Sequence, residues 1–355
     1  MDSSLYPHAF YAIVYLRSGF LFGVFIKSIN LNKGFLRPLF VTNGGFYMRK
    51  FLCCRDNFAE KQAWQKYCWV NIEMPTEEDT LYLTRDLKIP SAFLSDIRDV
   101  DERPRIETED GWTLMILRIP YRDEGNDIPY ITVPLGIIMK ADYFVTICHH
   151  ATDMLPDFIR YMQRKKLPID GSWDLLFRLF LSSSVWYLKY LKQINNQSRA
   201  VEKELERSIQ NAELQRLLKI EKSLVFFITS LRGNDNLLVK LKNLKSQREF
   251  FDPDLVEDVE IELRQAQDTA RIYSDILSGT MDAFASVISN NLNVIMKRMT
   301  AISLLLMIPT LIASLYGMNV HNGLEDSHYG LFVIAIISVA FSILSYWMFR
   351  RKSWL

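Results

Sequence analysis

The chain has 355 residues, enough for about two domains at roughly 150 residues each. Its 42 Lys and Arg residues nearly balance 41 Asp and Glu residues, so the overall charge gives no reason to expect a nucleic-acid partner. The four cysteines (Cys53, Cys54, Cys68 and Cys148) form no CxxC pair, which favours free thiols in a reducing compartment over a disulfide or metal role.

Residues 1–47 are rich in aromatic side chains and carry few acids. Their apolar run, about Phe10 to Ile26, is interrupted by Arg17 and has no small-residue cleavage site, although a signal peptide or a third transmembrane helix is an alternative. We expect a nonessential or mis-assigned leader, with the native start at Met48.

Residues 48–171 alternate short β-rich runs with turn signals, which predicts a cytosolic α/β domain. Helices are expected over Pro75–Leu87, where Thr76 and several acids stand at the start, and over Pro90–Val100. An opening strand is expected just after Met48, and further strands over 68–72, 105–109, 112–119, 131–139 and 143–148.

Residues 172–250 have a helical period that is broken once, near Ser208–Asn211, and predict an antiparallel helical hairpin. Asp252 and Pro253 then open another helix as N-cap and first helical residue. No proline follows until Pro309, so a continuous helix to Tyr316 would be roughly 95 Å long at about 1.5 Å per residue. We expect a cytosolic stalk over 252–298 that continues into a membrane helix.

Two segments near the C-terminus carry no charge and are long enough to cross a bilayer: 299–317 and 329–349. Basic clusters lie at their outer ends, at Lys297-Arg298 and in the tail 350–355, whereas the connecting loop 318–328 has two acids and no Lys or Arg. The positive-inside rule therefore places both flanks and both termini in the cytoplasm. The alternative is a buried core hairpin of a soluble protein.

A polar stripe follows the first of these helices when positions are counted by alternating steps of three and four. A second face carries apolar heptads instead, including Leu263, Ala270, Leu277 and Ile288. Within a membrane a polar stripe must face protein or water, so it either packs tightly against another helix or lines a pore made by copies of this helix. Acidic rings at the cytoplasmic end would concentrate cations and favour the pore. The stripe consists of Asp268, Ile272, Asp275, Gly279, Asp282, Ser286, Ser289, Asn293, Met296, Thr300, Ser303, Met307, Thr310 and Ser314.

The tetrapeptide Tyr316-Gly317-Met318-Asn319, at the exit of the first membrane helix, resembles the signature of the CorA family of magnesium channels. The resemblance spans Met48 to Leu355. It implies a funnel-shaped homopentamer whose first membrane helix lines the pore, with Gly317, Met318 and Asn319 as the selectivity filter and no organic cofactor. Gly317 would free the backbone for a turn, Met318 would pack, and the Asn319 amide would bind hydrated Mg²⁺. The expected pore-lining residues are Asp282, Asn293, Met296, Met299 (at the gate), Ser303, Met307, Thr310 and Ser314, and Glu325 and Asp326 would attract cations to the loop.

The same resemblance implies regulation by intracellular Mg²⁺. Asp96 matches a carboxylate that binds Mg²⁺ together with a stalk carboxylate of a neighbouring subunit, here Asp258. The alternative is a solvated surface of salt bridges around Asp96, with Asp258 in an acidic helix N-terminus.

No motif of an enzyme is present: the chain lacks a P-loop, GxSxG and HExxH, and His149-His150 is interpreted as a surface loop. We therefore expect a passive Mg²⁺ influx channel in the cell's inner (plasma) membrane. Two alternatives remain, a transporter of Co²⁺, Ni²⁺ or Zn²⁺ on the same scaffold and a non-conducting membrane-anchored scaffold.

Overall fold

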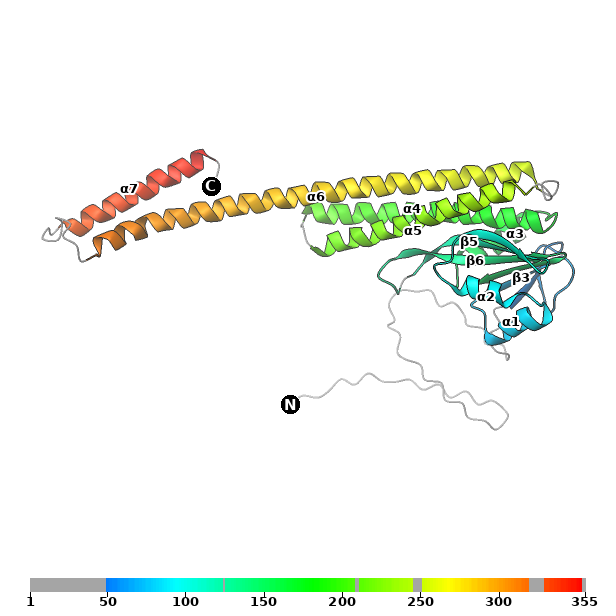
Figure 1. The fold of residues 1–355 in the computed structure, drawn as a ribbon. Coiled ribbons are helices and arrows are strands. Elements are labelled where there is room, and N and C mark those ends of the chain that lie inside the picture. Colours follow the sequence, from blue (N-terminus) through cyan, green and yellow to red (C-terminus); the bar gives the residue numbers. More distant parts are fainter. Residues whose placement is uncertain (1–48, 124, 208–210, 245–250, 319–328, 353–355) are drawn as a thin grey trace, which may run out of the picture. The chain divides into compact units, whose positions relative to one another are not determined.

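A mixed seven-stranded sheet organises the N-terminal half of the described chain. The computed structural model describes residues 49–123, 125–207, 211–244, 251–318 and 329–352 (Figure 1). The strand order is β2-β1-β3-β7-β6-β5-β4, and every neighbouring pair is antiparallel except β3–β7. All the predicted strands are confirmed, whereas the three-residue β2 was not predicted. The bounds are β1 Arg49–Cys53, β2 Ala59–Lys61, β3 Cys68–Glu73, β4 Arg105–Glu109, β5 Trp112–Arg122, β6 Tyr130–Lys140 and β7 Tyr143–Cys148.

One face of the sheet is covered by α1 (Glu77–Leu81), the π-helical turn η1 (Tyr82–Asp86) and α2 (Ser91–Arg98). The predicted cap is present: Thr76 Oγ1 accepts from the Asp79 N–H at 3.2 Å, and the Asp79 carboxylate accepts from the Thr76 N–H at 3.0 Å. The π-helical turn was not predicted. Helix α2 lies so close to β6 that a Cβ on Gly136 would stand 2.2 Å from Ile97 Cδ1, so only glycine fits there.

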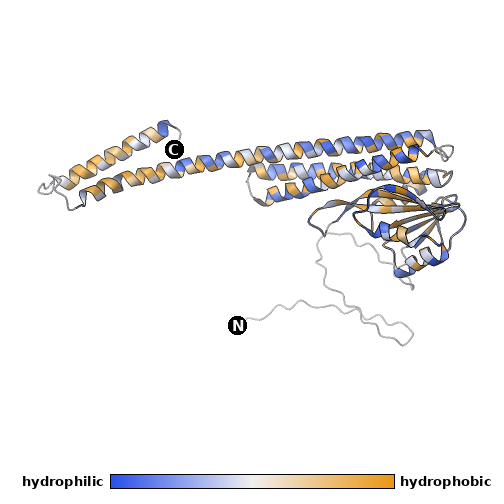
Figure 2. Cartoon of the chain, viewed as in Figure 1, coloured by the Kyte–Doolittle hydropathy of each residue, from blue (hydrophilic) through white to orange (hydrophobic). Residues whose placement is uncertain are grey.

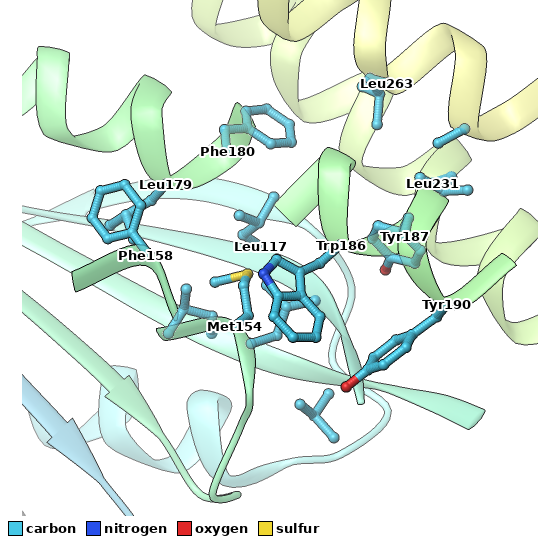
Figure 3. Close-up of a cluster of buried hydrophobic side chains, with 14 of the residues drawn as sticks. Leu117, Met154, Phe158, Leu179, Phe180, Trp186, Tyr187, Tyr190, Leu231 and Leu263 are labelled. Carbon is cyan, nitrogen blue, oxygen red and sulfur yellow. The ribbon is translucent and has the colours of Figure 1, made fainter. Parts of the chain in front are cut away.

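The other face carries α3 (Met154–Lys165), α4 (Ser172–Arg207) and α5 (Asn211–Lys242). Figure 3 shows the centre of this layer, where Leu117 of β5, Phe158 of α3 and Trp186 of α4 meet side chains of α5 and α6. The hairpin α4–α5 is confirmed, with its break at the predicted place. Helix α3 was not predicted.

Helix α6 runs unbroken from Pro253 to Tyr316, as predicted, and Pro309 does not end it. The Asp252 side chain caps its start by accepting from the Asp254 N–H at 3.1 Å. Helices α4 and α5 lie alongside its first part, where Leu263, Ala270 and Leu277 are buried (Figure 1). Beyond Leu277 the next buried residue of α6 is Ala301.

Helix α7 (Gly330–Arg351) packs against the C-terminal part of α6, and both are strongly apolar here (Figure 2). By length and composition the two helices could each cross a membrane. Only 6% of the apolar window of α6, and none of that of α7, is buried. A core hairpin of a soluble protein would be mostly buried, so that alternative does not describe these helices.

Candidate functional site

The polar stripe of α6 is uncovered along its whole length. All fourteen stripe positions from Asp268 to Ser314 are exposed, including the apolar Ile272 and the two methionines Met296 and Met307. On the same helix the apolar face is buried against α4 and α5 as far as Leu277. The two faces therefore differ: one packs within the chain, and the other is exposed in the single chain.

Two hydroxyl groups of the stripe are oriented by the helix that carries them. Ser286 Oγ donates to the Asp282 carbonyl oxygen at 3.0 Å, and Thr310 Oγ1 donates to the Leu306 carbonyl oxygen at 2.8 Å. Because each hydroxyl hydrogen is used in this way, the oxygen lone pairs remain free as acceptors. Oxygen acceptors without competing donors suit a cation or the water shell around it.

The acids of the stripe are unpaired. Asp268, Asp275 and Asp282 are exposed, and none forms an ion pair with another described residue. Lys242 and Arg264, which line the same hollow as Asp268, both bind Glu260 instead, at 2.5 and 3.0 Å. The negative charge of the stripe is thus uncompensated within the described chain.

The end of α6 differs from the prediction at Gly317 of the tetrapeptide. Gly317 has φ −77° and ψ −2°, an ordinary right-handed helical conformation, and its N–H bonds to the Ala313 carbonyl at 2.9 Å. Backbone freedom is therefore not the reason for glycine here, and that expectation was wrong. Met318 is 52% exposed in the single chain, and its packing stays a prediction. Asn319, Glu325 and Asp326 lie outside the described residues, and their roles stay predictions.

The gate and pore candidates share this exposure. Met299 is 65% exposed, and Asn293, Ser303 and Ser314 are exposed too. These residues point away from the chain's own core, and whether they meet one another across copies of the chain stays a prediction.

Asp96 lies at the end of α2 and is held by Arg105, whose Nη2 is 2.6 Å from its carboxylate. Arg105 also binds Glu102 at 2.6 Å and Glu107 at 3.1 Å. Burial alone would lower the pKa of Arg105, but the three carboxylates outweigh it and raise that pKa. Asp258 is exposed on α6, and the described residues contain no group of three or more His, Cys, Asp or Glu placed to hold a metal ion. The site that the resemblance implies would join two subunits, so the Asp96–Asp258 pair stays a prediction.

A buried polar network that the sequence did not reveal ties β5 to the helices. The Arg118 backbone N–H donates to Asn234 Oδ1 at 3.0 Å, and Asn234 Nδ2 donates back to the Arg118 carbonyl at 2.7 Å. Tyr187 donates to the same carbonyl at 3.0 Å, and burial raises the pKa of Tyr187. The one signal in the sequence was a charged residue, Arg118, inside an otherwise apolar β run.

The network also anchors the segment that leads from Asp96 to β4. The Arg118 guanidinium donates to the carbonyl oxygens of Val100 and, at 3.3 Å, of Glu102. Beside Asn234, a Cβ on Gly233 would lie 2.8 Å from Pro104 Cγ, so this segment rests directly on α5. Since α5 packs on α6, the Asp96 segment and the stalk are joined through one intermediate helix.

Comparison with known proteins identifies the family. The model of a family described as CorA-like Mg²⁺ transporter protein matches residues 64–351. The chain belongs to the CorA family. That membership confirms the resemblance seen in the tetrapeptide and places the chain among ion transporters instead of enzymes, with two candidate membrane helices.

Two curated CorA relatives cover most of the chain. The cobalt/magnesium transport protein CorA of Methanocaldococcus jannaschii is 26% identical over 81% of this chain and 91% of its own length. That of Thermotoga maritima is 24% identical over 81% of this chain and 83% of its own length.

Solved structures show the same fold. The complete CorA structure from M. jannaschii has a TM-score of 0.72 at 24% identity, covering 84% of this chain and 95% of that one. The full-length CmaX structure has a TM-score of 0.64 at 16% identity, covering 87% and 98%. The α/β domain, long helix and two C-terminal apolar helices are thus the CorA arrangement.

Proposed function

We propose that the chain is one subunit of a homopentameric channel that conducts Mg²⁺ passively into the cell and closes when intracellular Mg²⁺ is high. The observation that carries this proposal is the exposure of the whole polar stripe on a helix whose other face is buried. In a CorA-family chain, copies of α6 that turn their stripes toward a common axis would cover the stripe with one another and with water.

The chemistry of the stripe fits a hydrated divalent cation. Between Asn293 and Ser314 it carries no Asp, Glu, Lys or Arg, and its hydroxyl hydrogens at Ser286 and Thr310 are used by the helix. Mg²⁺ loses its water reluctantly, so neutral oxygens that bond to the water shell let the ion pass without stripping it. The Asn319 amide would be the ring that selects it, and Glu325 and Asp326 would concentrate cations in front of that ring.

The driving force needs no nucleotide. A membrane potential of 100 mV contributes about 2.3 kcal/mol per charge, hence roughly 4.6 kcal/mol for a divalent ion. The basic flanks of α6 and α7 support an orientation with both termini in the cytoplasm of the plasma membrane. Asp268, Asp275 and Asp282 would then form acidic rings at the cytoplasmic end.

For regulation, we propose that Mg²⁺ bridges Asp96 of one subunit and Asp258 of its neighbour in the closed state. In the single chain Asp96 is bound to Arg105 at 2.6 Å, so Mg²⁺ would compete with this arginine for the carboxylate. Losing the ion would return Asp96 to Arg105 and leave Asp258 repelled by its acidic neighbours. Neutralising both carboxylates (Asp96→Asn with Asp258→Asn) should abolish closure by intracellular Mg²⁺, and unchanged closure would contradict the proposal.

The test of conduction is ion flux into liposomes containing the purified protein, with Mg²⁺, Co²⁺ and Zn²⁺ offered separately. Cobalt is included because the curated relatives are named for both metals. We expect Mg²⁺ flux that Asn319→Ala abolishes. Flux of Zn²⁺ without Mg²⁺ would assign another ion, and no flux of any divalent ion from oligomeric protein would favour the scaffold.

A matched pair of substitutions tests the stripe itself. Thr310→Val removes a hydroxyl that bonds to a carbonyl four residues earlier, at constant side-chain shape. Ser342→Ala removes the same kind of bond, 2.9 Å to the Ser338 carbonyl, from α7. We expect lower Mg²⁺ flux from Thr310→Val only. An equal effect of both substitutions would mean that the stripe is not part of the ion pathway.

A further inference from the structure

Two cysteines stand directly opposite each other across the pair of strands β1 and β3. Cys53 and Cys68 are register partners in this antiparallel pair. The Cys54 N–H donates to the Tyr67 carbonyl at 3.0 Å, so the neighbouring pair 54/67 is the hydrogen-bonded one and the pair 53/68 is not. Non-hydrogen-bonded partners have Cα atoms about 4.5 Å apart. This lies within the range of about 4.4–6.8 Å that a disulfide spans.

The two thiols also share a face and an environment. Both lie on the face of the sheet where Phe51 and Val70 pack, since side chains alternate along a strand. Burial raises the pKa of Cys68, and a hydrogen bond with Cys53 adds to the rise, whereas the nearby Lys61 ammonium lowers it. The raised pKa disfavours the Cys68 thiolate, which suits a thiol that reacts second, after Cys53 has been oxidised.

Access differs between the partners. Cys53 is half-buried and Cys68 is 2% exposed. Because Cys53 is the more exposed of the two, an oxidant meets Cys53 first. The remaining cysteines are poor competitors, because burial raises the pKa of Cys54 and that of Cys148 each to about 12.

We propose that Cys53 and Cys68 form a redox-sensitive pair that hydrogen peroxide converts into a disulfide between β1 and β3. The Cys53 thiolate attacks one peroxide oxygen and breaks the O–O bond, which gives a sulfenic acid and, with the first thiol proton, one water. The Cys68 thiolate then attacks the sulfenic sulfur and forms the S–S bond. The displaced hydroxide takes the second thiol proton as another water. Two thiols lose two electrons in total, and the peroxide takes them up.

The experiment uses full-length protein in detergent, reduced, freed of reductant and exposed to hydrogen peroxide. Trypsin cuts after Lys50, Arg55, Lys66 and Arg85, so Cys53 and Cys54 share peptide 51–55 and Cys68 lies in peptide 67–85. The Cys54→Ser variant leaves Cys53 as the one thiol in its peptide and resolves which sulfur is bonded. Peptides are identified by mass spectrometry without reduction, beside Cys53→Ser and Cys68→Ser variants.

We expect a linked 51–55/67–85 peptide in wild type and in Cys54→Ser, and its loss in Cys53→Ser and in Cys68→Ser. Reduction by dithiothreitol should release both peptides. Absence of the linked peptide in Cys54→Ser, while folded helix content is retained by circular dichroism, would overturn the proposal. A link from Cys54, or one formed only between two chains in a non-reducing gel, would overturn it as well.

Discussion

Asn234 of α5 takes the place of a missing strand at the edge of the sheet. The pairing of β4 with β5 ends at Arg105 and Ile116, two residues before Arg118. The Arg118 N–H and C=O would face a continuing β4, and they bond instead to the side-chain amide of Asn234, at 3.0 and 2.7 Å. An amide side chain has one acceptor and donors in the same geometry as a peptide group, which explains why this buried position holds asparagine.

The stability lost on removing the Asn234 amide depends on which hydrogen bonds the Arg118 N–H and C=O keep. In Asn234→Ala the Arg118 N–H loses its partner in a fully buried place, which costs about 1–3 kcal/mol. The Arg118 carbonyl keeps the Tyr187 hydroxyl at 3.0 Å, so it adds little. A loss of about 2 kcal/mol lowers the melting temperature of a domain of 150–250 residues by roughly 4–8 °C.

The assay is thermal unfolding of the full-length protein in detergent, followed by circular dichroism at two heating rates. Asn236→Ala is the matched control, because Asn236 lies two residues further along α5 and is exposed. Tyr187→Phe should cost less, about 1 kcal/mol, since Asn234 still satisfies the carbonyl. If Asn234→Ala and the Asn236→Ala control have the same melting temperature, the Asn234 amide does not substitute for a strand.

Three further predictions address separate parts of the chain. Gly136→Ala should destabilise the sheet by about 1–3 kcal/mol because its Cβ would overlap Ile97, and Ile97→Ala in the same chain should recover part of that loss in denaturant unfolding. Burial lowers the pKa of His150, so the folded state resists protonation of this side chain, and stability should fall as the pH drops below about 6.5. The difference in melting temperature between pH 7.5 and pH 5.5 should therefore be smaller in His150→Gln than in the wild type. Gly317→Ala should leave the melting temperature within a few degrees, since the backbone is right-handed and the added Cβ would meet the carbonyl oxygens of Ala313, at 3.3 Å, and Ser314, at 3.7 Å. A large drop would show that the glycine is needed by the fold.

Long periodic segments made most of the fold predictable. Helices α4, α5 and α6 repeat the helical period over 36, 32 and 64 residues, and α7 is a long uncharged run, so their existence did not depend on local detail. Helix α3 has 12 residues and carries Pro156 in its first turn, and the pattern there is too short to be decisive. Strand β2 has three residues and gives no alternation to recognise.

The parts that could not be predicted depend on residues far apart in the chain. Arg118 and Asn234 are separated by 116 positions, and neither position indicates the other. The same holds for two close contacts, Gly233 with Pro104 and Gly136 with Ile97. Only the three-dimensional structure shows why one residue of each pair must be glycine. Gly317 is the opposite case, in which a motif suggested backbone freedom that the local conformation does not use.

The stripe and the heptad face of α6 show how far a sequence constrains function. Both follow from the spacing of side chains on one helix, which a sequence displays directly. What covers each face is a matter of assembly. Helices α4 and α5 cover the apolar face as far as Leu277, so that face is satisfied within the chain. The stripe is exposed in the single chain from Asp268 to Ser314, and its membrane part cannot remain against lipid. In the homopentamer that we propose, other copies of α6 and water would cover it, which is the condition for an ion path along a shared axis.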